Sequence, residues 1–121
     1  MEMMAASNAA AILNDLKART SGLAVALVSR DGSVLRAEMP PGTYVETFAI
    51  MCATLFGAAA TASRELDRAS PVRVVIEGSD AATLVATCGP SNLLVVVVAA
   101  GTDPSSAARE VERFAAVLST A

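Results

Sequence analysis

The sequence predicts an α+β domain in which three helices and five strands follow one another in the order αββαβββα. Two observations support this order. Apolar residues recur at helical spacing in three segments, and five short apolar or alternating segments are bounded by turn residues. The 121 residues suffice to bury one core, and no repeat or linker divides them. We therefore expect residues 1–121 to form one domain around a mostly antiparallel sheet.

The first three elements are a helix and a β-hairpin. Residues 5–18 predict an amphipathic helix. Residues 22–29 and 33–40 predict two strands around Asp31-Gly32, a pair typical of the tight primed turns of hairpins. The first strand is apolar on both faces and is expected to be central, whereas the second alternates charged and apolar residues and is expected at an edge. The apolar stripe of the helix comprises Ala5, Ala9, Ile12, Leu13 and Leu16.

A long second helix is predicted from residue 44 to residue 66. Pro40, Pro41 and Gly42 end the preceding strand, and Thr43 with Glu46 three residues later matches a capping box, in which two side chains satisfy backbone donors. After Pro71, residues 72–77, 82–88 and 93–100 predict three more strands, the last of them apolar on both faces and central.

The final helix is predicted to begin after Asp103, an N-cap residue followed by proline at the first helical position. Its charged residues cluster toward solvent on the opposite side from an apolar stripe. That stripe comprises Ala107, Val111, Phe114, Ala115 and Leu118.

Composition argues against several classes of function. The net charge is −3, no basic cluster occurs, and aromatic residues are 3% of the chain, which argues against nucleic-acid binding. The chain lacks histidine, the commonest general base near neutral pH and the commonest metal ligand. Cys52 and Cys88 lack metal-ligand spacing and are expected to be buried packing residues. We therefore expect no catalytic, cofactor-binding or metal-binding residue.

Isolated features that could bind ligands have simpler explanations. Asp31-Gly32 is explained by the hairpin, because no phosphate-binding glycine motif accompanies it. Ser105 and Ser106 could hold an anion at a helix start, but serine is also favoured in first turns for its own hydrogen bonds. We therefore interpret these residues as parts of a hairpin turn and of a helix start, and not as ligand-binding sites.

The residues from Thr47 to Ser63 form a run of seventeen without a charge. A spanning helix needs about 20 predominantly apolar residues, and this run is shorter and diluted by threonine, serine and glycine, so we expect no membrane insertion. The N-terminus lacks the basic start of a signal peptide, which favours a cytoplasmic protein. A helix without a charged side is expected to be covered on two faces, by its own sheet and by another subunit.

The two sides of this helix differ in the size of their side chains. Gly57 costs roughly 1 kcal/mol relative to alanine inside a helix, which suggests that a neighbouring backbone approaches closely there. The bulky side, expected to pack on the sheet, comprises Phe48, Cys52, Leu55, Phe56, Ala59 and Leu66. The lean side, expected to meet a partner, comprises Ile50, Met51, Thr54, Gly57, Ala58, Thr61 and Glu65.

The strand at 72–77 is the second part of the predicted interface. Its charged residues suggest a sheet edge, and an edge can pair with the same edge of a second copy. Two copies joined in this way would also bring their lean helix sides together. The strand residues assigned to this interface are Arg73, Val75 and Glu77.

The element order, the Asp31-Gly32 hairpin, the long second helix and the apolar strand at 93–100 together resemble the Roadblock/dynein light chain domain family, and most closely its free-standing prokaryotic members. The resemblance implies a profilin-like architecture with helix 2 on one face of the sheet and helices 1 and 3 on the other. It also implies dimers built from residues 44–66 and 72–77, whose paired helices form a platform for a Ras-like small GTPase.

The function implied is therefore a non-enzymatic, dimeric regulator or scaffold of a cytoplasmic Ras-like GTPase, which could stimulate its partner's hydrolysis only indirectly. Two alternatives stay open at this point. Sensory domains of profilin-like architecture bind small ligands and would require a polar-lined pocket. Scaffolding of the dynein type would use the same surfaces without a distinguishing residue.

Overall fold

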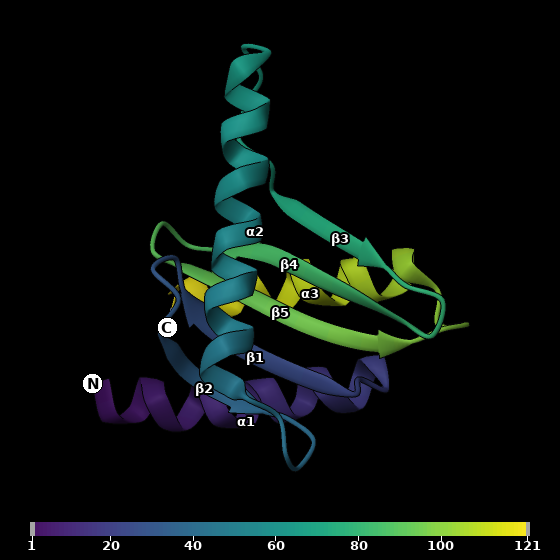
Figure 1. Ribbon diagram of the computed structural model, residues 1–121. Coiled ribbons are helices and arrows are strands. Elements are labelled where there is room, and N and C mark those ends of the chain that lie inside the picture. Colours follow the sequence, from purple (N-terminus) through teal and green to yellow (C-terminus); the bar gives the residue numbers. More distant parts are fainter. Residues whose placement is uncertain (1, 121) are drawn as a thin grey trace.

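Figure 1 shows the computed structural model of the chain, which describes residues 2–120. The elements follow the predicted order. They are α1 (Glu2–Thr20), β1 (Ala24–Ser29), β2 (Val34–Glu38), α2 (Val45–Glu65), β3 (Arg73–Glu77), β4 (Ala81–Cys88), β5 (Asn92–Ala99) and α3 (Pro104–Thr120). The predicted α+β class is confirmed, and the strands form one sheet in which every pairing is antiparallel.

The strand order in the sheet is β2-β1-β5-β4-β3. Strands β1 and β5 are central, as their apolar character on both faces predicts, because each must bury side chains above and below the sheet. Strands β2 and β3 lie at the two edges, also as predicted. An edge strand presents unpaired backbone N–H and C=O groups, so this sheet has two places where another strand could add.

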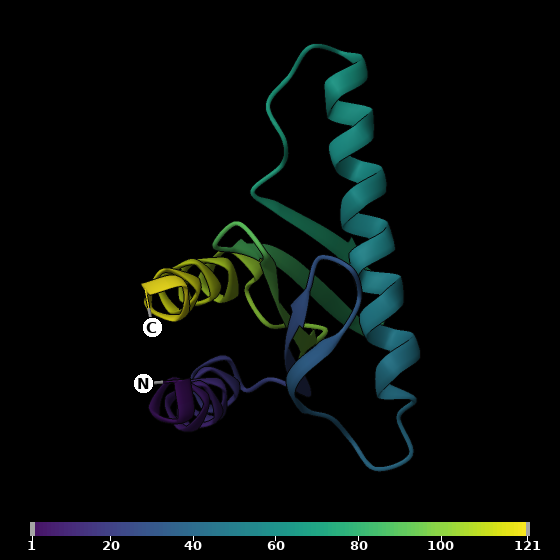
Figure 2. The ribbon, with the colours of Figure 1, turned by 90° about the vertical axis from the view of Figure 1, so that its left-hand side faces the viewer.

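Helices cover the two faces of the sheet unequally. Figure 2 shows α1 and α3 side by side on one face and α2 alone on the other, which is the layering that the resemblance implies. The core under α1 and α3 includes Leu13, Leu16, Val111 and Phe114, whereas the core under α2 includes Cys52, Phe56 and Val95. The predicted stripes of α1 and α3 are confirmed for the described side chains. Ala5 lies outside the described side chains.

The hairpin turn between β1 and β2 differs from the predicted primed type. The N–H of Gly32 donates to the carbonyl of Ser29 at 3.0 Å, and of the loop residues only Gly32 has a positive φ, 95°. A primed type I turn requires positive φ at both central residues. The prediction was wrong because the loop has three residues, Arg30 to Gly32, and the glycine supplies the left-handed residue that closes it.

The predicted capping box at the start of α2 is absent. The N-cap residue is Tyr44, which makes no side-chain capping hydrogen bond. The Thr43 hydroxyl instead donates to the carbonyl of Pro40 at 2.8 Å, because the Pro-Pro-Gly segment turns back toward it. The helix thus begins one residue later than the capping box required. The N-cap prediction for α3 is correct, since Asp103 Oδ1 accepts the backbone N–H of Ser105 at 3.0 Å.

Candidate partner interface on the second helix

The outer side of α2 is the main candidate site. Cys52 is 4% exposed and Phe56 is 2% exposed, and both face the sheet. Leu66, assigned above to this bulky side, is 74% exposed, so that part of the prediction is wrong. The reason is geometric: the C-terminal half of α2 extends past the edge of the sheet, where no strand lies beneath it (Figures 1 and 2).

All seven residues predicted on the lean side of α2 are exposed. Ile50 is 47% exposed and Met51 is 54% exposed, so two adjacent large apolar side chains reach solvent on this side of the helix. The Thr54 hydroxyl donates to the carbonyl of Ile50 at 2.8 Å, and the Thr61 hydroxyl accepts from Arg64 at 3.2 Å. The Thr54 hydroxyl proton is thus already bonded within the helix, which lowers the cost of covering that residue.

No neighbouring atom within the described monomer explains why α2 has a glycine at position 57. A Cβ built on Gly57 would meet no other atom within 4 Å, leaving aside the backbone of its own helix turns. The close backbone approach that the sequence suggests is therefore not made within the described monomer. It would have to come from another molecule.

Gly57→Ala tests this point. In an isolated monomer we expect the free energy of unfolding to rise by roughly 0.5 to 1 kcal/mol, because alanine is the better helix former and the space is open. If a partner backbone contacts Gly57, the same variant should weaken assembly. Thermal denaturation at two protein concentrations tenfold apart separates the two effects, since only an assembly has a concentration-dependent melting temperature.

The predicted strand residues lie on the other side of the sheet. Arg73 pairs with Ala86 and Val75 pairs with Leu84, and both partners belong to the core under α1 and α3. The Arg73 guanidinium forms an ion pair with Glu112 of α3. The structure therefore does not bring Arg73, Val75 and Glu77 together with the seven α2 residues. The three strand residues and the seven α2 residues therefore lie on opposite faces of the sheet.

The β3 side chains on the α2 side of the sheet are Val74 and Ile76. Val74 pairs with Val85 and packs against the α2-side core, and Ile76 is 45% exposed. Val72, the residue before β3, is 67% exposed. None of these three residues was predicted at the interface. Alternation along a strand indicates that it has two faces, but it does not show that a helix crossing an edge strand leaves part of that strand uncovered.

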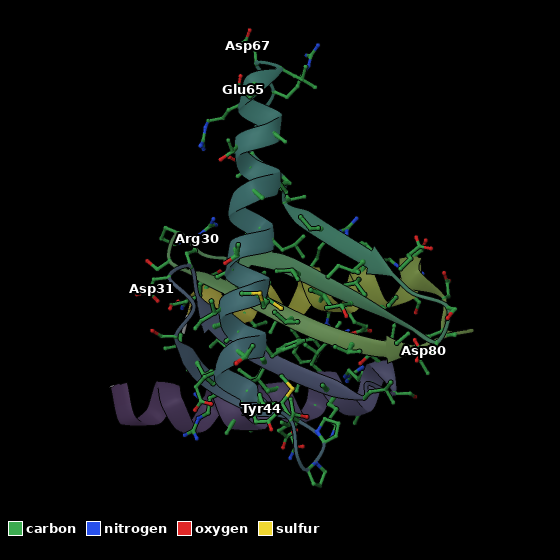
Figure 3. The ribbon with its side chains drawn as sticks, viewed as in Figure 1. Arg30, Asp31, Tyr44, Glu65, Asp67 and Asp80 are labelled. Atoms are coloured by element: carbon green, nitrogen blue, oxygen red, sulfur yellow. The ribbon has the colours of Figure 1, made fainter. Side chains whose placement is uncertain are left out.

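The hairpin lies beside α2 on the side away from β3, as the labelled Arg30 and Asp31 show in Figure 3. The Arg30 guanidinium lies 5.4 Å from the centre of the Phe56 ring, a cation–π contact. Asp31 accepts hydrogen bonds from the Ser29 hydroxyl and from the backbone N–H of Ser33, and these bonds lower the pKa of its carboxyl group. The Arg30 contact thus joins the hairpin to the helix, and the Asp31 hydrogen bonds stabilise the hairpin itself.

The cysteines are not reactive groups. Cys52 and Cys88 are both free and buried, on opposite faces of the sheet. Burial raises the pKa of the Cys52 thiol to about 11 and also raises that of Cys88, so both stay protonated near neutral pH. Their predicted role as packing residues is confirmed. Within the described residues, no group of three or more cysteine, aspartate or glutamate side chains could hold a metal ion.

Helix α2 is also the one described helix whose length and composition would allow it to cross a membrane. Only 17% of its most apolar window is buried within the protein, which reflects the exposed side described above. A partially covered amphipathic helix meets the same test, so the expectation that α2 does not insert stays a prediction.

Comparisons with known proteins agree on the family and the fold. Residues 6–98 match the model of the Roadblock/LC7 domain. No curated protein sequence matches the chain. A solved structure described as MglB with tetrameric arrangement has a TM-score of 0.89 at 22% identity, with 96% of this chain and 88% of that chain covered.

Two further solved structures extend the comparison. The gliding protein MglB from Thermus thermophilus has a TM-score of 0.89 at 21% identity, with 96% of this chain and 89% of that chain covered. Profilin II from Acanthamoeba castellanii has a TM-score of 0.65 at 19% identity, with 89% and 94% covered. The α+β architecture is therefore similar to that of MglB and, less closely, to that of profilin. On the family match over residues 6–98, this chain belongs to the Roadblock/LC7 family.

Proposed function

We propose that this protein is a non-enzymatic, dimeric regulator or scaffold of a cytoplasmic Ras-like small GTPase, bound on a platform formed by two α2 helices. The observation that supports this proposal is the exposed outer side of α2, uncharged from Thr47 to Ser63, together with the unpaired edge of β3. Such a surface on a small domain is typical of a protein–protein interface. Stimulation of GTP hydrolysis, where it occurs, acts through the conformation of the partner.

The small-ligand alternative finds less support. The hollow between α2 and β3 has a volume of about 260 Å³ and is lined mainly by apolar side chains. Ligand pockets typically enclose about 300 to 1,000 Å³ and place several polar groups around the ligand. This hollow is smaller than that range and lacks a convergent polar set. A hollow between the end of α1 and the start of α3 has polar walls, but its volume is only about 180 Å³. Dynein-type scaffolding would use the same outer side of α2 and differs from the leading proposal only in its partner.

Assembly and partner binding are tested separately. Light scattering at tens of micromolar should give twice the mass of 12.3 kDa, and a monomer at that concentration would contradict the dimer. A small GTPase encoded beside this protein's gene, loaded with GDP or with a non-hydrolysable GTP analogue, should then be retained by the immobilised protein in one nucleotide state more than in the other. Equal absence of retention in both states would contradict the GTPase proposal while leaving the dimer intact.

A further inference from the structure

One side of α2 lies next to the hairpin of β1 and β2 and stays open to solvent. We call it the hairpin flank, and it comprises Ile50, Thr54, Gly57 and Thr61, which recur at helical spacing and are all exposed. The hairpin lies against this side, because a Cβ on Gly32 would lie only 3.0 Å from Ile50 Cγ1. None of the four residues is charged, so a charge beside them has to come from a neighbouring residue.

Arg30, in the loop of the hairpin, places a positive charge beside this flank. Its guanidinium lies 5.4 Å from the centre of the Phe56 ring, and Figure 3 shows Arg30 next to α2. Phe56 is buried, so its ring holds one face of the guanidinium in a fixed position. Arg30 itself is exposed. A second molecule can therefore reach a cation whose place is already set.

No acidic side chain of residues 2–120 forms an ion pair with Arg30. The arginines that do form ion pairs in this part of the chain are Arg19, Arg73 and Arg113. Asp31 is adjacent in sequence, but its carboxylate accepts hydrogen bonds from the Ser29 hydroxyl and the Ser33 backbone N–H within the turn. The positive charge of Arg30 is therefore not neutralised by its own turn.

A second cation lies at the far end of the same flank. Arg64 follows Gly57 by seven residues, about two helical turns, and donates to the Thr61 hydroxyl at 3.2 Å. In the described chain neither Arg64 nor the adjacent Glu65 forms an ion pair. The hairpin flank is thus an uncharged stripe between two arginines without acidic partners, Arg30 and Arg64. Such a stripe complements a surface with an apolar centre and a carboxylate beside it.

The surroundings of Arg30 favour a protein carboxylate over a phosphate-rich surface. Nucleic acids and anionic membranes are bound by several cations gathered on one face. This flank has only two, far apart along the helix, and the net charge of the chain is −3. A planar guanidinium matches one carboxylate through two parallel hydrogen bonds. The exposed side chain of Ile50 adds apolar area of the kind found in protein–protein interfaces.

We propose that Arg30 is the charged contact by which the hairpin flank recognises the small GTPase, and that it binds a carboxylate on the GTPase surface. This inference rests on the proposed function and specifies the side of α2 and the residue that determine the choice of partner. Arginine is among the residues that contribute most at protein interfaces. The Phe56 ring orders the guanidinium before the partner arrives, so less conformational freedom is lost on binding.

Arg30→Met tests the contact, because methionine keeps an apolar stem over the Phe56 ring and removes the charge. The probe is the small GTPase encoded beside this protein's gene, in the nucleotide state that the immobilised protein retains. We expect its dissociation constant, measured by calorimetry, to rise about tenfold or more. Circular dichroism checks that the variant is folded.

Arg36→Met is the matched control. Arg36 is an exposed arginine of the same hairpin, but it pairs with Leu27, which belongs to the core under α1 and α3. It therefore lies on the face of the sheet away from α2. This variant removes the same charge from the chain and should change the dissociation constant less than about twofold, as expected for a residue outside the contact.

The effect of salt separates a charged contact from a structural role. The affinity of the wild-type protein should fall as sodium chloride is raised, because salt screens an ion pair, and that of Arg30→Met should fall less. Arg30→Lys keeps the charge without the planar, two-bond geometry. Its affinity should lie between the other two and should retain the dependence on salt.

The outcomes distinguish this contact from the proposed function. Wild-type affinity in Arg30→Met, an equal loss in Arg36→Met, or equal salt dependence in Arg30→Met and the wild type would overturn the contact and leave the GTPase proposal in place. Failure of the wild-type protein to bind the GTPase in either nucleotide state would overturn both. Self-association that changes in Arg30→Met while GTPase binding does not would assign the flank to a second copy, which also overturns the inference.

Discussion

Phe56→Ala should lower the free energy of unfolding by about 3 to 5 kcal/mol, the range seen for truncating a buried aromatic residue. Phe56 is 2% exposed and lies in the core between α2 and the sheet, and the Arg30 guanidinium covers its ring. Because small domains are stabilised by only about 5 to 15 kcal/mol, this loss is a large fraction of the total. Urea denaturation followed by circular dichroism, at one fixed protein concentration, gives the value.

Two controls separate the contributions at this position. Phe56→Leu keeps most of the apolar volume and should cost less than about 1.5 kcal/mol if the core repacks around it. Arg30→Ala removes only the cation over the ring and should cost about 0.5 to 1 kcal/mol at this exposed position. A loss below about 1 kcal/mol for Phe56→Ala, well under the range for a buried aromatic residue, would mean that this residue does not anchor α2 to the sheet.

Gly32→Ala should have the second-largest effect, a loss of about 2 to 4 kcal/mol, because two costs combine there. The first is the backbone, which has a φ of 95° at Gly32. The second is space, since a Cβ at Gly32 would lie 3.1 Å from the Cα of Ile50, a backbone atom that cannot move aside without shifting α2. The hairpin would then separate from the helix, which also loosens the contact between Arg30 and Phe56.

Gly42→Ala is the matched control for Gly32→Ala. Gly42 has a similar φ of 86°, but a Cβ there would meet nothing within 4 Å. It should therefore show the backbone cost alone, about 1 to 2 kcal/mol. The difference between the two variants, measured by the same denaturation, reports the contact between the hairpin and α2. Equal losses for both would contradict close packing at Ile50.

Much of the fold could be predicted because the relevant signals are local. Apolar periodicity identified the three helices, the two-sided apolar character of β1 and β5 identified the central strands, and the residue pair Asp103-Pro104 identified the start of α3. Local signals failed where two local interactions competed. The Thr43 hydroxyl bonds to Pro40 rather than capping α2, and the hairpin closes with a three-residue loop although its Asp-Gly pair is typical of a two-residue turn.

The candidate interface shows more clearly what could not be predicted from the sequence alone. The uncharged run from Thr47 to Ser63 determined that α2 has a second apolar side, because charge is a property of the sequence itself. Which flank faces β3 and which faces the hairpin depends on the rotation of α2 about its own axis, and distant residues such as Gly32 and Val95 set that rotation by packing. Leu66 is exposed for a different reason: α2 extends past the edge of the sheet (Figure 2), and only the tertiary structure fixes where the sheet ends beneath the helix. The sequence by itself determined that α2 has a second, uncharged side, because residue identity alone sets charge. The tertiary structure decided which of its residues stay exposed, because packing on the sheet fixes how the helix is rotated and where its cover ends.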